Sequence, residues 1–112
     1  MSTFFAKTYE KTASARTTEE LHRRAYNASF EHFGLTIDDV PVVWSVEYYD
    51  VLANTVGGGK PKMKHHFGAN GWPATPSFFA GAVASGDDER DALVDALQDK
   101  KTEFYKQIVE QT

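Results

Sequence analysis

The sequence predicts an all-α protein, a small four-helix bundle. Apolar residues recur at helical spacing in four segments, and glycine and proline stand between those segments. The length of 112 residues suits one domain with a single modest core. Because the chain has no cysteine, no disulfide helps to stabilise it and packing has to supply the stability. We therefore expect helices joined by short connectors around one core.

The first sixteen residues, 1–16, differ in composition from the rest. They contain Ser, Thr, Ala, Lys and Arg with Glu10 as the single acid, and they show little apolar periodicity. We interpret 1–16 as a flexible leader that is either disordered or docked on a partner, and its composition also resembles an organelle transit peptide. The helical domain is predicted to cover 17–112.

The first predicted helix covers Thr17 to Phe33. Thr17 and Glu20 have the spacing of a capping box, and Gly34 provides a C-terminal stop. At 100° per residue, one broad arc holds Leu21, Ala25, Tyr26, Ala28, Phe30 and Phe33. His22 falls near the middle of this arc. Two interpretations stay open for His22: a hydrogen-bonded core histidine, or a titratable group that faces a cleft.

Two shorter helices follow an irregular connector. The segment Trp44 to Val56 has apolar residues at helical spacing, and the run Gly57-Gly58-Gly59 ends it. Pro61 suits the first turn of the third helix, because proline needs no intrahelical hydrogen-bond donor there. Gly71-Trp72-Pro73 ends this helix, and residues 74–86 are predicted to form a loop.

The longest predicted helix covers Asp87 to about Glu110. Its first turn is acidic, where the helix dipole favours anions, so Asp87-Asp88 is interpreted as a helix start. Its apolar stripe consists of Leu93, Leu97, Phe104 and Ile108. Lys101 projects from the centre of this stripe. A lysine there marks a cleft, a paired charge or a bundle end, or else it extends to solvent.

Several function classes do not fit the sequence. The net charge of −4 argues against a general nucleic-acid binder, since phosphate backbones favour basic surfaces. No apolar run approaches the roughly 18 residues that a membrane span needs. His65 and His66 point about 100° apart on a helix and so do not easily chelate one metal ion. No nucleophile with an attendant base is recognisable.

The strongest candidate for ligand chemistry is Gly57-Gly58-Gly59-Lys60-Pro61. Free backbone N–H groups and a lysine at a helix N-terminus form a plausible anion cradle, and glycine allows close approach of the ligand. The run is not a Walker loop, because its spacing differs and Pro61 stands where Ser or Thr would hold magnesium. A flexible hinge is the other interpretation of these glycines, and the sequence leaves both open.

Five segments resemble a known family. They are Thr18 to Asn27, Trp44 to Tyr49, Val56 to Met63, Asn70 to Pro73 and Leu97 to Glu103. In these segments the chain resembles the C1-type cap domain of haloacid dehalogenase-like hydrolases, especially the CbbY-like branch and its plant and algal plastid members. The resemblance covers about Thr17 to Glu110. It implies a four-helix cap that selects a sugar phosphate, and a chloroplast location.

The family transfers phosphoryl groups through an aspartyl-phosphate and holds magnesium with acids of its catalytic core. Its D-x-D-G motif would fall on 10–13, where this sequence reads Glu-Lys-Thr-Ala. The resemblance therefore implies a cap without the catalytic core, with no cofactor in this chain and no activity alone. Joined to a core, it would contact the sugar-phosphate substrate. The alternative is a non-catalytic helical binding or structural subunit that kept the bundle and has a protein partner.

The resemblance assigns no catalytic residue and no metal ligand in this chain. It assigns substrate binding to Glu19, His22, Gly58, Gly59, Lys60 and Lys101. The first two match positions at the cap hinge, the next three match a basic residue and its backbone partners near the distal phosphate, and the last matches a lysine that reaches the reaction cleft. The resemblance implies that the faces carrying these residues look onto a water-filled cleft.

Overall fold

The computed structural model describes residues 6–76 and 81–111, with side chains from Thr18 onward. These residues form four helices and two very short strands, which confirms the predicted all-α class. In chain order, the elements are α1 (Ala6–His32), β1 (Thr36–Ile37), β2 (Val40–Pro41), α2 (Val46–Thr55), α3 (Gly59–Asn70) and α4 (Gly86–Gln111). None of the helices in the described ranges is long and apolar enough to cross a membrane.

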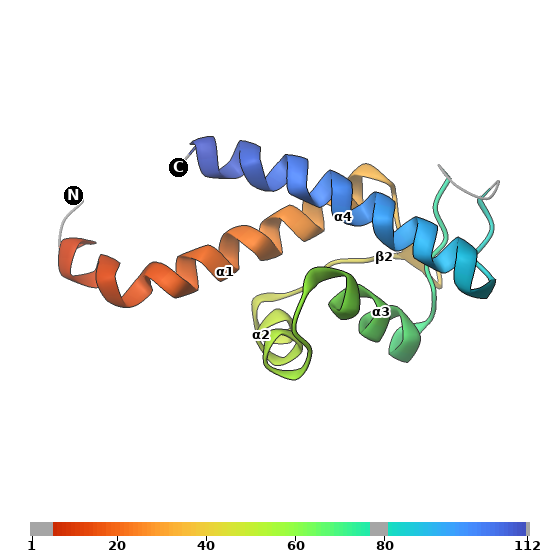
Figure 1. The fold of residues 1–112 in the computed structure, drawn as a ribbon, viewed down its shortest axis with the longest axis horizontal. Coiled ribbons are helices and arrows are strands. Elements are labelled where there is room, and N and C mark those ends of the chain that lie inside the picture. The colour runs from red at the N-terminus through yellow and green to blue at the C-terminus, as the bar shows by residue number, and fades with distance from the viewer. Residues whose placement is uncertain (1–5, 77–80, 112) are drawn as a thin grey trace.

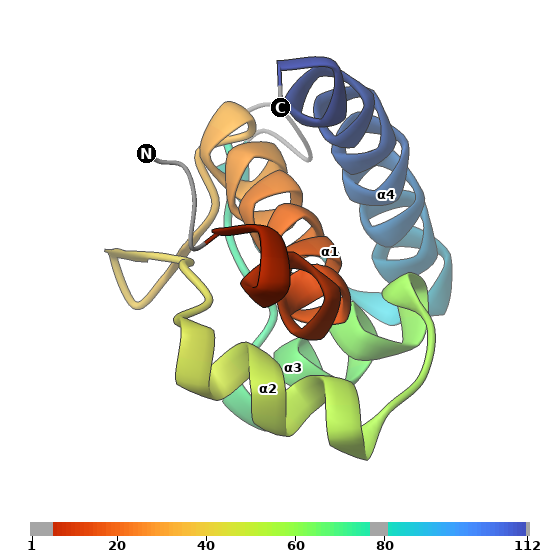
Figure 2. The same cartoon turned by 90° about the vertical axis from the view of Figure 1, so that its left-hand side faces the viewer.

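The two long helices, α1 and α4, run side by side in opposite directions (Figure 1). The shorter helices α2 and α3 lie together against one side of this pair (Figure 2). A buried hydrogen bond ties the pair together, because Ser29 Oγ donates to the Leu97 carbonyl over 2.8 Å. A fully buried hydroxyl needs such a partner. The arrangement leaves one continuous core where the four helices meet.

Aromatic side chains dominate that core. Trp44, in the connector before α2, is completely buried and packs on Tyr26 and Phe30 of α1. Phe67 of α3 meets Phe30 edge to face, with ring centroids 6.2 Å apart. Met63, Leu93 and Leu97 complete the contact between α3 and α4 and are also fully buried. Burial of these large apolar surfaces is the main favourable contribution to folding.

Helix α1 begins at Ala6, well before the predicted start at Thr17. The prediction of a capping box is wrong, since Thr17 is inside the helix and the Glu20 carboxylate pairs with the Arg23 guanidinium instead. The physical reason is intrinsic propensity: residues 6–16 contain alanine, lysine, glutamate and arginine and no glycine or proline. The end of the helix is as predicted, because Gly34 adopts a positive φ of 62° just beyond His32.

A minimal hairpin follows α1. Strands β1 and β2 pair antiparallel, and the two residues between them, Asp38 and Asp39, have φ values of 52° and 65°. Positive φ at both positions is typical of a tight type I′ turn, and aspartate tolerates this conformation better than most residues. On its other edge, Thr36 forms two backbone hydrogen bonds with Ala74. The hairpin thereby fastens the segment after α3 to the segment after α1.

The other three helices closely match the sequence prediction. Helix α2 begins after Ser45, whose side chain accepts a hydrogen bond from the Tyr48 N–H. Helix α3 holds Pro61 in its first turn and ends before Gly71. Helix α4 carries Asp87 in its acidic first turn, as expected. Part of the predicted 74–86 loop, 77–80, lies outside the described residues.

Candidate functional site

His22 of α1 and Lys101 of α4 contact each other directly. The Lys101 ammonium donates to His22 Nδ1 over 2.8 Å. An accepting Nδ1 requires a neutral imidazole that carries its proton on Nε2. The His22 ring also stacks on Tyr105, with ring centroids 4.2 Å apart and an interplanar angle of 8°. The two residues that stood out within apolar stripes are therefore partners across the helix pair.

Lys101 is buried, with 6% of its surface exposed. The interpretation that its side chain extends to solvent is wrong. Its ammonium lies 4.6 Å from the centroid of the Tyr26 ring and 5.0 Å from that of Tyr105, both within the range of a cation–π contact. Among the described residues, no carboxylate forms an ion pair with Lys101. Burying a positive charge without a compensating acid is costly.

The pKa values of Lys101 and His22 are both lowered in the folded chain. Burial lowers the pKa of Lys101, and the positive charge of Lys62 lowers it further. Burial also lowers the pKa of His22, and the charges of Lys101 and Lys62 act in the same direction. Desolvation disfavours the protonated form of both groups, and so does each neighbouring cation. A bound anion would offset this repulsion.

The start of α3 approaches the same pair of helices. A side chain at Gly59 would place its Cβ 2.3 Å from the Tyr26 hydroxyl of α1 and 2.4 Å from Gln98 Oε1 of α4, so either side chain would have to shift to accept it. Gly58 precedes the helix with a φ of 86° and provides no side-chain cap. The N–H groups in the first turn of a helix have no intrahelical partner and favour anions. The glycines thus bring backbone donors close to Tyr26, which also contacts Lys101.

The three lysines of α3 lie in two different environments. Lys60 and Lys64, one helical turn apart, form ion pairs with Asp95 and Asp91 of α4 over 2.8 and 2.7 Å. Lys62 lies between them in sequence and therefore points to a different side of the helix. Its ammonium reaches back to the Gly58 carbonyl at 3.5 Å, and its charge acts on both His22 and Lys101. The carboxylates of α4 thus form ion pairs with the two outer lysines, whereas no carboxylate in the described part of the chain forms one with Lys62.

The six predicted site residues are partly brought together. His22 and Lys101 contact each other, and Gly59 packs on Tyr26 beside them. Lys60 is paired with Asp95, so its role in anion binding stays a prediction. Glu19 is exposed, and its charge acts on Tyr49 of α2, whose pKa is raised to about 12 mainly by burial.

Sequence reasoning missed Lys62, Tyr26, Tyr105 and Asp95. The separate environment of Lys62 could have been predicted, because Lys62 lies two residues from Lys60 and so points to another face of the same helix. Tyr26 was recognised as apolar, but its hydroxyl reaches Gly59 only in the folded chain. The pairing of Lys60 with Asp95 depends on the register between α3 and α4, and no local pattern in the sequence reveals this register.

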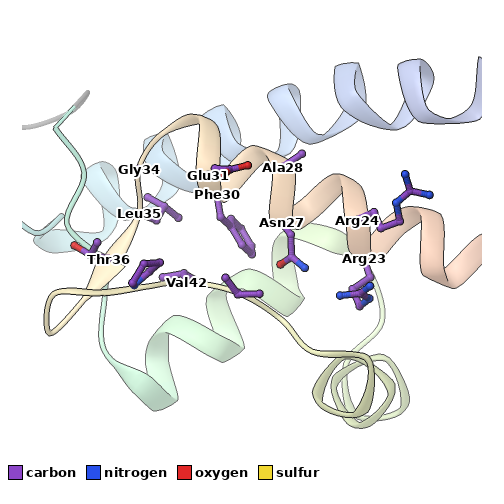
Figure 3. A pocket seen from close by; sticks show the side chains of 12 residues that line it. Arg23, Arg24, Asn27, Ala28, Phe30, Glu31, Gly34, Leu35, Thr36 and Val42 are labelled. Atoms are coloured by element: carbon purple, nitrogen blue, oxygen red, sulfur yellow. The ribbon is translucent and has the colours of Figure 1, made fainter. Parts of the chain in front are cut away.

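A pocket of about 570 Å³ lies elsewhere on α1, between this helix and the segment after it. Figure 3 shows Phe30, Leu35 and Val42 directed between the helix and that segment. Two polar lining residues are already engaged, since Arg23 donates to the Trp44 carbonyl and Asn27 bonds both the N–H and the carbonyl of Trp44. None of the six predicted residues lines this pocket.

The described residues contain no group of three or more His, Cys, Asp or Glu side chains arranged to hold a metal ion. His65 is exposed, while His66 accepts at Nδ1 from the Tyr48 hydroxyl over 2.6 Å or donates to it, depending on its tautomer. The two histidines therefore have different surroundings.

Comparison with known proteins places this chain in a family context. It is 46% identical over 95 residues to a haloacid dehalogenase-like hydrolase domain-containing protein of Arabidopsis thaliana, a match that covers 82% of this chain and 29% of the relative. It is 29% identical over 94 residues to a CBBY-like protein of the same organism, covering 84% of this chain and 25% of the relative. No family model and no solved structure matches.

The chain spans less than a third of the length of either of these relatives. The matched stretch is nevertheless most of this chain, so the similarity concerns the helical domain described above. By these similarities the chain belongs to the haloacid dehalogenase-like superfamily, is related to its CbbY-like members and corresponds to a part of those proteins.

Proposed function

We propose that this helical domain is the cap of a haloacid dehalogenase-like phosphatase and that it selects a sugar phosphate. The observation that carries the proposal is the buried Lys101, which faces His22 and two tyrosine rings without a carboxylate partner among the described residues. The cost of burying this charge is offset when an anion binds beside it. A phosphate group supplies both the charge and several acceptor oxygens.

In this proposal each group around Lys101 has a part. Lys101 and Lys62 bind phosphate oxygens by charge-assisted hydrogen bonds, and the amides near Gly58 and Gly59 donate further hydrogen bonds. Neutral His22 fixes the position of the Lys101 ammonium, because its Nδ1 accepts a hydrogen bond from it. Tyr26 and Tyr105 hold the ammonium between their rings and exclude water.

The chemical step would come from a catalytic core. In the family, magnesium and the aspartate nucleophile belong to that core, and residues 10–13 of this chain contain no aspartate. We therefore propose that this chain contributes substrate binding, carries no cofactor of its own and does not turn over a phosphate ester alone. Such a cap works by orienting the substrate and covering the reaction from water.

An assay of sugar-phosphate hydrolysis tests this function. The chain alone should show no turnover at any magnesium concentration. The same chain placed as the cap of a complete haloacid dehalogenase-like core should support turnover, and Lys101→Ala in that fusion should reduce it. Lys106→Ala, which changes an exposed lysine five residues further along α4, should not. Turnover by the chain alone that one of its own substitutions abolishes would refute the proposal.

A second candidate function is a non-catalytic helical subunit with a protein partner. The observation in its favour is the 570 Å³ pocket, which lies away from the predicted residues and is lined in part by Val43, an exposed apolar residue. In that case Val43→Ser should weaken partner binding, whereas Lys101→Ala should not. The cap proposal predicts the reverse for binding of a sugar phosphate.

We also propose a chloroplast location. The support is the family resemblance together with residues 1–16, which are rich in Ser, Thr, Lys and Arg and contain a single acid. Import of a fluorescent fusion of the chain into isolated chloroplasts tests this location. Fluorescence that stays outside the organelle would contradict it.

A further inference from the structure

We propose that the pocket between α1 and the segment 34–43 binds a short extended segment of a partner protein, which places one apolar side chain between an acidic and a basic one. The pocket has a volume of about 570 Å³, within the range of about 300–1,000 Å³ that is typical of ligand sites. None of the residues that we assign to phosphate binding lines it. The inference therefore goes beyond the proposed function and does not depend on it.

The walls of this pocket are fixed by hydrogen bonds within the chain. Arg23 Nη1 donates to the Trp44 carbonyl over 2.9 Å, and Asn27 Nδ2 donates to the same carbonyl over 3.0 Å. Near the other end of the pocket, the Leu35 N–H donates to the Phe30 carbonyl over 3.0 Å. A ligand therefore meets a preformed surface and does not have to order these segments, which lowers the cost of binding.

The interior of the pocket is apolar, and its outer edge carries an exposed apolar residue. Phe30, Leu35 and Val42 are part of the lining and are almost fully buried. Val43 lines the same pocket with 67% of its surface exposed, and Pro41 is also exposed. An apolar side chain of a partner would cover Val43 and so remove apolar surface from water.

Two charges of opposite sign stand along α1 at this pocket. Arg24 and Glu31 both line it and are exposed, and neither forms an ion pair with another side chain in the described ranges. Figure 3 shows them in a row along the helix, with Ala28 between them. A partner that presents an acid to Arg24 and a base to Glu31 therefore complements the charge of the pocket.

The spacing of these two charges sets the pattern of the partner. Arg24 and Glu31 are two helical turns apart, about 10 Å along the axis. In an extended chain, alternate side chains point to the same side, and residues i and i+4 are about 13 Å apart. The long side chains of Arg24 and Glu31 can bridge the difference. The matching segment thus has an acid and a base four residues apart, with an apolar residue midway between them.

Side chains, and not the backbone, should hold this segment. Strand addition to an exposed sheet edge depends on backbone hydrogen bonds. The second residue of the two-residue strand β2 is Pro41, which has no N–H to donate. The apolar side chain and the two charges of the partner therefore provide the specificity.

The experiment is a titration of this chain with the synthetic peptide acetyl-Glu-Thr-Leu-Thr-Lys-amide at low ionic strength. Amide chemical shifts should change in 27–31 and 34–43, while those of Gly58, Gly59 and Lys101 should not. Three further peptides are compared: one with serine in place of leucine, one with glutamate at both charged positions and one with lysine at both. Each should bind about threefold more weakly or worse, because an exposed ion pair contributes up to about fivefold in affinity.

Variants of the protein test the two charges separately. Arg24→Gln and Glu31→Gln should each weaken binding of the first peptide about two- to fivefold. Glu31→Gln should also reduce the preference for this peptide over the one with two glutamates. Lys106→Gln and Glu110→Gln are the matched controls, because both residues are exposed on α4 and do not line the pocket. They should leave the affinity unchanged.

Three results would overturn the inference. The first is equal binding of all four peptides, or equal effects of the pocket variants and their controls. The second is an absence of shifts in 27–31 and 34–43 at millimolar peptide. The third is a set of shifts in the pocket that depends on the concentration of the chain alone, which would assign the pocket to a second copy. None of these results bears on phosphate binding at Lys101, so the proposed function would stand or fall separately.

Discussion

The ammonium of Lys101 donates to His22 Nδ1 over 2.8 Å and so joins residues 79 positions apart in the chain. Both groups are bases whose pKa is lowered, first by burial and then by neighbouring positive charge. The folded protein therefore favours a neutral His22 beside the lysine. Protonation of His22 would remove the acceptor and place two cations side by side.

The first prediction concerns stability against pH. The pKa of His22 in the folded chain is below its ordinary value of 6.5. The unfolded chain therefore takes up a proton at His22 more readily, and the folded state loses stability as pH falls from about 6.5 through the lower folded pKa. Urea unfolding at pH 8 and at pH 5 should show a smaller free energy of unfolding at pH 5. His22→Gln should reduce this difference.

His32→Gln is the control for this measurement, because His32 lies on the same helix and is exposed. The comparison shows whether a change in pH dependence belongs to His22. Some dependence should persist in His22→Gln, since burial also lowers the pKa of His66. A pH profile that is the same in the His22→Gln variant and the parent chain would contradict the argument.

The second prediction is that Lys101 strengthens phosphate binding and lowers the stability of the fold. Replacing this buried cation with methionine removes its desolvation cost and keeps much of its volume. Buried charges replaced by apolar residues of similar size are often neutral or stabilising, so Lys101→Met should raise the free energy of unfolding by about 1 kcal/mol. Phosphate binding at the amides of Gly58 and Gly59 should weaken. A strongly destabilised variant would show that Lys101 serves packing and not binding.

Much of the fold could be predicted from local patterns. The apolar periodicity predicted four helices, and the turn residues placed most helix ends within two residues of their observed positions, as for α2 at Val46–Thr55 and α4 at Gly86–Gln111. These features depend on neighbours in sequence. The start of α1 was mispredicted because a capping signal at Thr17 was given more weight than the helix-forming residues before it.

The candidate site was only partly predictable. His22 and Lys101 were identified because each interrupts an apolar stripe, which is a local signal. Their contact with each other depends on how α1 and α4 are aligned, and the pairing of Lys60 with Asp95 depends on how α3 and α4 are aligned. Long-range register is set by packing of the whole core, so periodicity within single helices does not determine it.

The third prediction concerns the leader. The leader 1–16 is predicted to lie outside the helical domain, and among the side chains that the structure describes the buried hydrophobic ones run from Ala25 to Leu97. Removing residues 1–16 should therefore lower the total helix signal in circular dichroism but leave the midpoint of thermal unfolding within a few degrees, about the shift that a surface change produces. A large loss of stability would show that the leader packs on the bundle and that the domain begins before residue 17.

The last prediction concerns the close approach at Gly59. An alanine there would bring its Cβ to 2.3 Å from the Tyr26 hydroxyl and 2.4 Å from Gln98 Oε1. Gln98 can move aside, but the Tyr26 ring is 4% exposed and packs against Trp44, so it has little room. Overpacking of this kind costs about 1–3 kcal/mol. Gly59→Ala should lower the urea midpoint accordingly and displace the start of α3 from α1.

Gly57→Ala is the matched control for this prediction, because it lies in the same glycine run and a Cβ there would meet nothing within 4 Å. Its free energy of unfolding should stay within about 0.5 kcal/mol of the parent chain. If the glycines served only as a flexible hinge, both substitutions would change stability little and by similar amounts. A large difference between them instead assigns Gly59 to a fixed contact, which holds the backbone donors of α3 beside Tyr26 and, through that ring, near Lys101.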